Sequence, residues 1–397
     1  MTAPIRIAIL GSTGSIGRST LEVVRRHPDR FDIVALAAHR SLADLARQVE
    51  SCRPRRAVIA DHTALVGVAD LPSCRWEAGR DALLSIASDP DVDVVVNAIV
   101  GSAGLEPTLA ALRAGKRLAL ANKESLVAGG PLVMQAAARG GGQLVPVDSE
   151  HSAILQCLAG SEPAAVARIV LTASGGPFRG WNLGALEGVC PSDALRHPTW
   201  EMGAKITIDS ATLANKALEV IEAHFLYGLP YSAIEVVVHP QSVVHSFVEF
   251  VDGSVLAQMG FPTMELPILY ALSHPARVDD ARLRTFDPVR CSPLTFEAVD
   301  RSLFPLFGLG VDAGRAGGTA PAAFNAANEV AVEAFLGGRL RFPDMAGVIE
   351  AALDGHEGAP VRDVEDVLRA DRDARALARR AVERAEAGSR QRTGAGA

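Results

Sequence analysis

The sequence predicts an α/β protein that begins with a doubly wound parallel sheet, continues with a central α+β domain and ends in an α-helical bundle. Three observations predict this class. Apolar β-type runs alternate with helical patterns up to residue 147, longer loops and three closely spaced β-type runs follow, and Ala-rich helical periodicity dominates after residue 300. We therefore expect domains over residues 1–147, 148–275 and 301–390, with a linker over residues 276–300.

The N-terminal elements alternate regularly. The first β-type run, Ile5–Leu10, leads into a helical pattern over Ser15–Arg26, and the second run covers Phe31–Ala37. Later strands are predicted at Ala57–Ala60, Val92–Ile99, Arg117–Ala121 and Gln143–Val147. A helix is predicted at Leu105–Ala114, between the second and third of these strands. Strands so rich in Val, Ile and Ala are typical of a parallel sheet covered by helices on both faces.

The central domain is predicted to contain one helix over Ala211–Phe225, followed by β-type runs at Ile234–His239, Val243–Phe250 and Ser254–Met259. Beyond a Pro-containing stretch near residues 270–295, helical patterns cover Ala322–Leu336, Asp344–Leu353 and Val364–Ala385. The last residues, Arg390–Ala397, have no apolar face and are expected to fray.

The composition excludes several classes of protein. A net charge of −7 argues against nonspecific binding to nucleic acid or to an anionic membrane, because both need a broad positive field. The five cysteines are scattered and lack CxxC spacing, so they indicate neither a disulfide framework nor a zinc site. No apolar run approaches the ~18–20 residues of a membrane span. We expect a cytoplasmic protein that meets any anionic substrate with a local cluster of polar groups.

A glycine-rich segment follows the first predicted strand directly and opens the first predicted helix. Its spacing is GxxGxxG, and the residues that would approach a dinucleotide are Gly11, Thr13, Gly14, Ser15, Ile16 and Gly17. Glycines permit close backbone approach, and a helix N-terminus offers N–H groups and positive dipole to a pyrophosphate. The context predicts a Rossmann-like cofactor loop. The alternative is a tight turn in a cofactor-free domain.

The second predicted strand ends in Ala38, His39 and Arg40, with no carboxylate placed to accept from an NAD ribose. A guanidinium pairs bidentately with a 2′-phosphate, so this segment favours NADP(H). The alternative is a solvated loop arginine. Asn122 and Glu124 fall at the end of a later strand, where ligands of such sheets bind.

Two carboxylates, Asp148 and Glu150, follow the run Gln143–Val147. If the strand continues through them, its period of two points both to one side, where a cation would relieve their repulsion. A helix N-cap or a solvated turn is the alternative. A third carboxylate, Glu219, lies on a polar stripe of the helix Ala211–Phe225, for which a solvated face is the default explanation.

The start of that predicted helix also carries groups suited to a phosphate. Ser210, Asn215 and Lys216 gather there, and Ser174, which precedes two glycines, would complete the cradle. Between the Ser174 turn and this helix lies the loop His197–Gly203, in which Trp200 and Met202 are large apolar side chains. We interpret the loop as a lid over the substrate. The alternative is that Trp200 plugs the domain core.

The chain resembles the 1-deoxy-D-xylulose 5-phosphate reductoisomerase family. The resemblance rests on motifs that occur in order along most of the chain: Gly11–Gly17, Asn122–Glu124, Val147–Ser152, Thr172–Arg179, His197–Lys205, Asp209–Glu219, His239–Ser242, Gln258–Gly260 and Asn325–Val330. It implies a homodimeric enzyme that rearranges the carbon skeleton of 1-deoxy-D-xylulose 5-phosphate and then reduces it with NADPH to 2-C-methyl-D-erythritol 4-phosphate, in non-mevalonate isoprenoid precursor biosynthesis.

The resemblance also implies roles for individual residues. Those matching Asp148, Glu150 and Glu219 hold one Mg²⁺, Mn²⁺ or Co²⁺, which acts as a Lewis acid. Those matching Ser174, Ser210, Asn215 and Lys216 bind the substrate phosphate, with His197 close by, and those matching Lys123 and Ser149 contact the reacting polyol. The flap His197–Gly203 closes over the substrate, with Gly203 beside the cofactor. For Lys123 alone, the alternative is a surface lysine at a strand end.

The chain departs from the family pattern at four positions, none in the expected metal or phosphate set: His39, Ser41, Thr263 and Glu265. Two other functions stay open from the residues themselves. One is a simple NADP-dependent dehydrogenase of a phosphorylated substrate, which needs no carboxylate metal site. The other is a nonenzymatic NADP-binding redox sensor. His245, in a β-type run, fits a satisfied core residue slightly better than a catalytic one.

Overall fold

The computed structural model describes residues 3–65 and 70–394, with the side chains of the last helix described as far as residue 388. The described residues form two compact units. The first comprises residues of 1–125, 131–155 and 263–285, and the second comprises residues of 126–130, 156–262 and 286–397. The division into a cofactor domain, a catalytic domain, a linker and a helical domain is one of function and stays a prediction.

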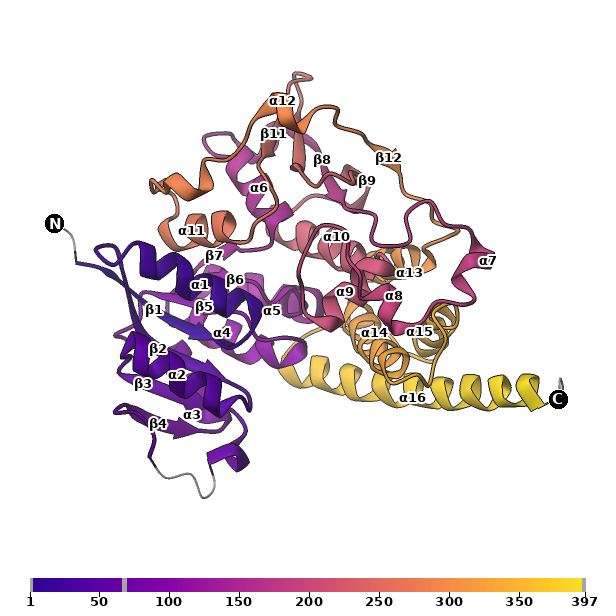
Figure 1. Ribbon diagram of the computed structural model, residues 1–397, viewed down its shortest axis with the longest axis horizontal. Coiled ribbons are helices and arrows are strands. Elements are labelled where there is room, and N and C mark those ends of the chain that lie inside the picture. The colour runs from indigo at the N-terminus through magenta and orange to yellow at the C-terminus, as the bar shows by residue number, and fades with distance from the viewer. Residues whose placement is uncertain (1–2, 66–69, 395–397) are drawn as a thin grey trace. The chain divides into compact units, whose positions relative to one another are not determined.

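The first unit is built on a seven-stranded sheet, visible among the indigo and purple elements of Figure 1. Its strands run in the order β4-β3-β2-β1-β5-β6-β7, and every pairing is parallel. Their bounds are β1 Ile5–Leu10, β2 Phe31–Ala38, β3 Arg56–Ile59, β4 Arg75–Ala78, β5 Val94–Asn97, β6 Arg117–Leu120 and β7 Gln143–Pro146. The strand order reverses between β1 and β5, which is where such sheets bind ligands beyond the strand ends.

Helices cover both faces of this sheet, as the sequence predicts. Side chains of β1 at Ile7 and Ile9 belong to one core cluster with apolar residues of α1, Ser15–Arg26, of α2, Leu42–Cys52, and of α11, Glu265–Ser273. Because strand side chains alternate, Ala8 and Leu10 point to the opposite face, which α3, Arg80–Ala87, and α4, Leu105–Arg113, cover. Two further helices follow β6 and β7: α5, Lys123–Gly140, and α6, Ser149–Cys157.

Helix α5 was not predicted from the sequence. It contains Pro131, and its backbone leaves helical geometry at Gly129, so the helical pattern is interrupted in the middle. It begins with Lys123, and the preceding Asn122 caps it by accepting a hydrogen bond from the backbone N–H of Ser125. Lys123 therefore lies in the first turn of a helix.

The second unit contains a mixed five-stranded sheet in the order β11-β10-β8-β9-β12. Its strands are β8 Val166–Ala173, β9 Ile234–Val238, β10 Val244–Phe250, β11 Val255–Met259 and β12 Glu297–Ala298. Strands β8 and β9 are parallel, and the N–H of His239 donates to the carbonyl of Ala173 at 2.7 Å. The turns that follow these two strands therefore start side by side.

The segment predicted as one helix over Ala211–Phe225 is two helices. Helix α9 spans Ala204–Ala211 and α10 spans Ala214–Tyr227, and Leu213 between them has a left-handed φ of 58°. No Gly or Pro marks the break, and Ala and Leu near it are good helix formers, so the pattern predicted a continuous helix. Ser210 thus lies in the last turn of α9, and the prediction that it starts the next helix is wrong.

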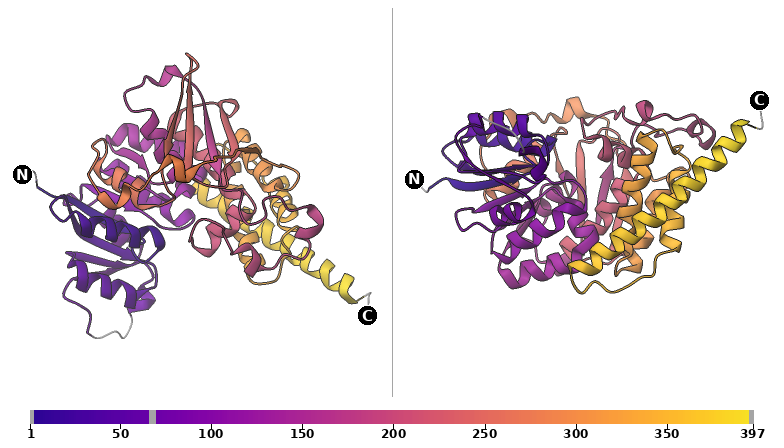
Figure 2. Two further views of the ribbon diagram at one scale, coloured as in Figure 1. Left: turned by 45° about the horizontal axis from the view of Figure 1, so that its top comes forward. Right: turned by 90° about the horizontal axis from the view of Figure 1, so that it is seen from below.

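The C-terminal residues form the predicted helical bundle. It comprises α13 Pro305–Ala316, α14 Ala320–Leu336, α15 Met345–Asp354 and α16 Val364–Gly394. Figure 2 shows α16 running along the neighbouring helices of the same colour range, and α14 and α15 pack against it. The backbone remains helical through residue 394, so the expected fraying from Arg390 is not seen there, and residues 395–397 lie outside the described part.

Helix α14 also packs on α9. The buried Asp209 of α9 accepts a hydrogen bond from the Asn328 side chain at 2.7 Å and pairs with Lys205 one turn earlier at 2.9 Å. Since a buried carboxylate needs such partners, α14 and α9 are held together by polar as well as apolar contacts.

The remaining helical elements are short. They are the 3-10 turns His62–Leu65, Ser102–Gly104, Pro163–Ala165, Tyr231–Ala233 and Ala281–Leu283, and the single-turn helices α7 Leu183–Leu186, α8 Pro191–Ala194 and α12 Pro288–Cys291. Among the helices described, none has the length and apolar character needed to cross a membrane. The fold class predicted from the sequence, a parallel sheet, an α+β region and C-terminal helices, is confirmed.

Candidate active site

The glycine-rich loop between β1 and α1 is shaped by close backbone approach. Gly11 has a φ of +84°, and a Cβ there would lie 2.5 Å from the carbonyl oxygen of Ala98. A Cβ at Gly17 would lie 2.5 Å from the backbone of the same loop. Only glycine fits either position. Gly14 precedes α1 without a side-chain cap, so the first-turn N–H groups of Ser15, Ile16 and Gly17 face the loop at the switch point of the sheet.

The end of β2 presents the residues expected to read the adenosine end of a cofactor. Ala38 is buried, while His39 and Arg40 are exposed. The Arg40 side chain forms an ion pair with Asp61, which follows β3. Asp61 was not singled out from the sequence, since nothing in a linear pattern shows which strand lies beside β2.

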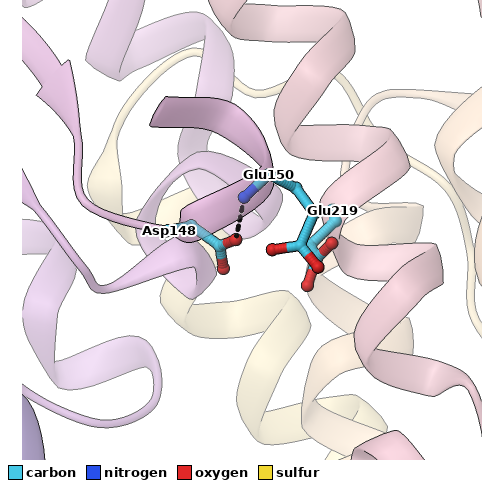
Figure 3. A group of neighbouring side chains, drawn as sticks. All are labelled: Asp148, Glu150 and Glu219. Atoms are coloured by element: carbon cyan, nitrogen blue, oxygen red, sulfur yellow. Dashed lines mark hydrogen bonds between the residues drawn. The ribbon is translucent and has the colours of Figure 1, made fainter. Parts of the chain in front are cut away.

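Three carboxylates come together as expected for a metal site. Oxygens of Asp148, Glu150 and Glu219 lie within 4.8 Å of one another, and Figure 3 shows the three side chains converging from the end of β7, the start of α6 and α10. Oxygen-only donors of this kind suit Mg²⁺ or Mn²⁺ better than softer metals. Among the described residues, this is the one group of at least three acidic, His or Cys side chains so arranged.

The route by which Asp148 and Glu150 converge differs from the prediction. Strand β7 ends at Pro146, so no period of two extends through residues 148–150. Glu150 lies instead in the first turn of α6, and its backbone N–H points at the Asp148 carboxylate, 3.4 Å from Oδ1. Both carboxylates thus stand at a helix N-terminus, whose dipole favours negative charge.

Lys123 lies beside these carboxylates and is buried, so it is not a surface lysine. Its Nζ is 2.5 Å from Oδ2 of Asp148. Burial acts to raise the pKa of Asp148, but Lys123, His151 and the hydrogen bond with Glu150 together outweigh burial and hold that pKa well below its usual range. Because its pKa is lowered, Asp148 is ionised over the neutral pH range. Ser149, next in the chain, donates from its hydroxyl to Glu150 at 2.5 Å.

The polar stripe of α10 is not a solvated face. Lys216, Glu219 and Glu222 are all buried. Asn215 donates from its side-chain amide to Glu219 at 2.5 Å, and Lys216 forms an ion pair with the other oxygen of the same carboxylate. Buried charges are costly unless they are paired, and the contacts of Asn215 and Lys216 with Glu219 meet that requirement. Glu222 follows Glu219 by three residues and lies on the same stripe of α10.

The Ser174 turn packs directly on the end of α9. Gly176 has a φ of +65°, and a Cβ there would lie 2.8 Å from the carbonyl oxygen of Ser210. Ser174 and Ser210 are thereby brought together, although Ser210 does not start a helix. The Gly176 N–H donates to the Ser174 hydroxyl at 3.2 Å, so in this structure it is bound within the turn.

His197 connects this turn with the expected lid. Its Nδ1 accepts hydrogen bonds from the backbone N–H groups of Thr199 at 3.1 Å and Trp200 at 2.8 Å. Nδ1 must then be unprotonated, so the ring proton sits on Nε2 and is donated to the Ser174 hydroxyl at 2.9 Å. Burial lowers the pKa of His197 to about 4, which keeps the ring neutral at pH 7.

The lid residues are not part of the core. Trp200 and Met202 are half-buried, and Gly203 is exposed. The Trp200 ring lies 6.5 Å from the ring of His245, which is itself buried in β10.

Asn122 and Glu124, which were expected to lie near the cofactor, are buried. The Asn122 amide donates to the carbonyls of Ile99 and Gly101 and to Glu124. Asn122 therefore shapes the loops at the end of β5.

These features define a class: a dinucleotide-binding α/β enzyme with a carboxylate cluster suited to a divalent cation. Comparison with known proteins gives the family. The family model of 1-deoxy-D-xylulose 5-phosphate reductoisomerase matches residues 7–130. Two models of C-terminal domains of the same reductoisomerase match residues 144–227 and residues 259–377.

Relatives match over nearly the whole chain. The reductoisomerase of Cupriavidus necator is 52% identical over 385 residues, which is 95% of this chain and 98% of the relative. That of Gloeobacter violaceus is 51% identical over 390 residues, 96% of this chain and 98% of the relative. The chain belongs to the 1-deoxy-D-xylulose 5-phosphate reductoisomerase family.

Solved structures of the family have the same fold. The Zymomonas mobilis enzyme in complex with NADPH superposes with a TM-score of 0.88 at 44% identity, covering 96% of this chain and 99% of that one. A reductoisomerase in complex with NADPH, fosmidomycin and magnesium superposes with a TM-score of 0.90 at 40% identity, covering 96% and 98%.

Proposed function

We propose that the chain converts 1-deoxy-D-xylulose 5-phosphate to 2-C-methyl-D-erythritol 4-phosphate, using NADPH and one divalent cation, in isoprenoid precursor biosynthesis. The observation that carries this function is the full-length match to relatives of that activity at about 50% identity. The carboxylate cluster and the glycine-rich loop supply independent support, because the first fits a hard cation and the second fits a dinucleotide.

The cation would be held by Asp148, Glu150 and Glu219. Three oxygen ligands leave further coordination positions of a hard cation for substrate oxygens. Bound there, the cation supplies Lewis acidity toward the ketone and the oxyanions of the rearrangement. Lys123 stands beside Asp148, and we propose that its ammonium group stabilises negative charge that develops on the substrate. Ser149, hydrogen-bonded to Glu150, would contact the same polyol.

The phosphate of the substrate is proposed to bind to Ser174, Ser210, Asn215 and Lys216. The packing of Gly176 on Ser210 supports this assignment because it brings the two serines together. Asn215 and Lys216 follow in the first turn of α10, where N–H groups and the helix dipole favour an anion. In a protein with a net charge of −7, such a local cluster is what allows an anion to bind.

We propose that His197 acts through position and not as an acid. A neutral ring that accepts from the lid backbone and donates to Ser174 links the lid to the phosphate group. Ser174 can then give its hydroxyl proton to the phosphate while it accepts from His197. The lid would exclude water from the reactive aldehyde that precedes reduction.

This assignment predicts the behaviour of Trp200→Ala. Because Trp200 is only half-buried, the change should spare thermal stability and NADPH affinity and should lower kcat/KM. Intrinsic fluorescence measured in a Trp76→Phe, Trp181→Phe background, in which Trp200 is the one remaining tryptophan, should change on addition of substrate or a phosphonate analogue. A core plug would behave differently: the same truncation would cost roughly 3–5 kcal/mol of unfolding free energy, visible as a large fall in Tm.

The homodimer and the cytoplasmic location are also proposals. Strand β11 lies at the edge of the second sheet, and Val251, Val255 and Leu256 on or beside it are exposed large apolar side chains. An exposed apolar edge of this kind suits a second copy of the chain. Sedimentation tests the interface: the wild type is expected to be dimeric, and Leu256→Glu is expected to be monomeric.

The proposed cytoplasmic location has separate support. The five cysteines are all free, which agrees with a reducing compartment.

A cation requirement tests the proposed activity against a simple dehydrogenase. Consumption of NADPH with 1-deoxy-D-xylulose 5-phosphate should stop when EDTA removes divalent cations and should return when Mn²⁺ or Mg²⁺ is added in excess. Turnover that persists in EDTA would favour a dehydrogenase without a metal site, and NADPH binding without any turnover would favour a redox sensor.

A further inference from the structure

We infer that Asp61 is a specificity-determining residue, which acts by holding Arg40 in position for the 2′-phosphate of NADPH. The inference rests on the proposed use of NADPH and deepens it, because it assigns the preference for the phosphorylated cofactor to a pair of residues from two neighbouring loops.

The sheet topology brings the two residues together. Strands β2 and β3 are parallel neighbours, so their carboxyl ends meet at one edge of the sheet. The pairing continues past both strands: the N–H of Ala60 donates to the carbonyl of Ala38 at 2.9 Å, and that of Asp61 donates to the carbonyl of His39 at 3.0 Å. The Asp61 backbone is thus fixed beside the loop that carries Arg40.

The Asp61 carboxylate is fixed as well. Its Oδ1 accepts from both the backbone N–H and the hydroxyl of Thr63, at 3.0 and 2.7 Å, and its Oδ2 accepts from Nε of Arg40 at 2.5 Å. The hydrogen bonds from Thr63, followed by that from Arg40, hold the pKa of Asp61 well below its usual range. The Asp61 side chain is 12% exposed, whereas that of Arg40 is 73% exposed.

The geometry leaves part of the guanidinium available. Within the described residues, Asp61 is the one hydrogen-bond partner of the Arg40 guanidinium, and it is bound through Nε. The two terminal amino groups therefore remain to bind a phosphate, which a planar guanidinium does bidentately. An exposed arginine otherwise samples many rotamers, and ordering it on binding weakens the complex. The ion pair with Asp61 orders the Arg40 side chain before the cofactor binds.

The same contacts act against NADH. A carboxylate that accepts from the ribose hydroxyls favours NAD in folds of this type. Asp61 is committed to Arg40 and Thr63, so it is not available to take that role. A counter-effect exists, because the negative charge of Asp61 repels a phosphate. Water around the largely exposed Arg40 guanidinium, where the phosphate would bind, screens that repulsion, and we expect the ordering of Arg40 to decide the sign.

Asp61→Asn separates these effects. The amide keeps an oxygen that can accept from Thr63, so the turn is preserved, but it presents Arg40 with a group that does not attract it. We expect the Kd for NADPH, measured by fluorescence titration, to rise roughly 3–10-fold while the Kd for NADH stays within twofold. Asp44→Asn removes a charge from α2 that pairs with Arg47 and not with Arg40, and it serves as the matched control.

A double-mutant cycle with Arg40→Ala completes the test. Arg40→Ala should raise the Kd for NADPH much more than that for NADH, and Asp61→Asn in that background should add nothing. If Asp61→Asn leaves NADPH binding unchanged or tightens it, or if its penalty persists without Arg40, the positioning role is wrong. If Arg40→Ala does not change the preference between cofactors, the assignment of the 2′-phosphate to Arg40 fails first, and the inference fails with it.

Discussion

Replacing Glu219 by Gln should abolish most of the activity while the protein stays folded. The amide preserves shape and hydrogen bonding to Asn215 but removes one of three charges that converge at the candidate metal site. Loss of groups that merely support metal ligands costs about 10–100-fold, so loss of a ligand should lower kcat by at least about 100-fold. The affinity for Mn²⁺, measured by calorimetric titration, should fall in parallel.

Two further variants sharpen this expectation. Asp148→Asn should behave like Glu219→Gln, because both carboxylates belong to the same cluster. Glu333→Gln changes an exposed glutamate of α14 and should leave both metal affinity and kcat unchanged. An unaltered Mn²⁺ titration for Glu219→Gln would remove α10 from the metal site.

Lys216→Ala should selectively weaken binding of the phosphorylated substrate. Lys216 is buried at the start of α10, and a hydrogen bond between charged groups there contributes about 1.5–3 kcal/mol, which corresponds to roughly 10–150-fold in affinity. KM for 1-deoxy-D-xylulose 5-phosphate should rise by that factor. The unphosphorylated sugar should be converted with kinetics much less changed.

Because Lys216 also pairs with Glu219, its effect on the metal must be measured separately. Lys216→Arg keeps the charge and should retain part of the phosphate affinity. Equal losses for the phosphorylated and unphosphorylated sugars would show that Lys216 does not bind the phosphate, and would point to its pairing with Glu219 as the source of the loss.

Much of the first unit could be predicted from the sequence because local rules agree there. The helix Ser15–Arg26 has the predicted bounds, since a glycine loop starts it and the apolar spacing continues to its end. The parallel sheet follows from strands rich in Val and Ile. Helix α5 could not be predicted in the same way, because Gly129 and Pro131 interrupt its pattern and packing within the protein overrides them.

The candidate site, too, could be predicted only in part from local sequence patterns. Asp148, Glu150 and Glu219 were predicted as a metal cluster and do converge, yet by another route, since β7 ends at Pro146. The break at Leu213 depends on a left-handed backbone that no residue type announces. The pairing of Arg40 with Asp61 depends on the order of strands in the sheet, which is a property of the whole fold.

The central claim is that one active site both rearranges the carbon skeleton and reduces it. The most direct measurement is NMR of the product formed from 1-deoxy-D-xylulose 5-phosphate in the presence of Mn²⁺ and NADPH, after removal of the paramagnetic cation. The account predicts 2-C-methyl-D-erythritol 4-phosphate, whose methyl group sits on a branched carbon and appears as a singlet, formed in equal amount to the NADPH consumed. A linear 1-deoxypentitol phosphate, whose methyl protons are split by a neighbouring hydrogen, would contradict it, because reduction would then have occurred without rearrangement.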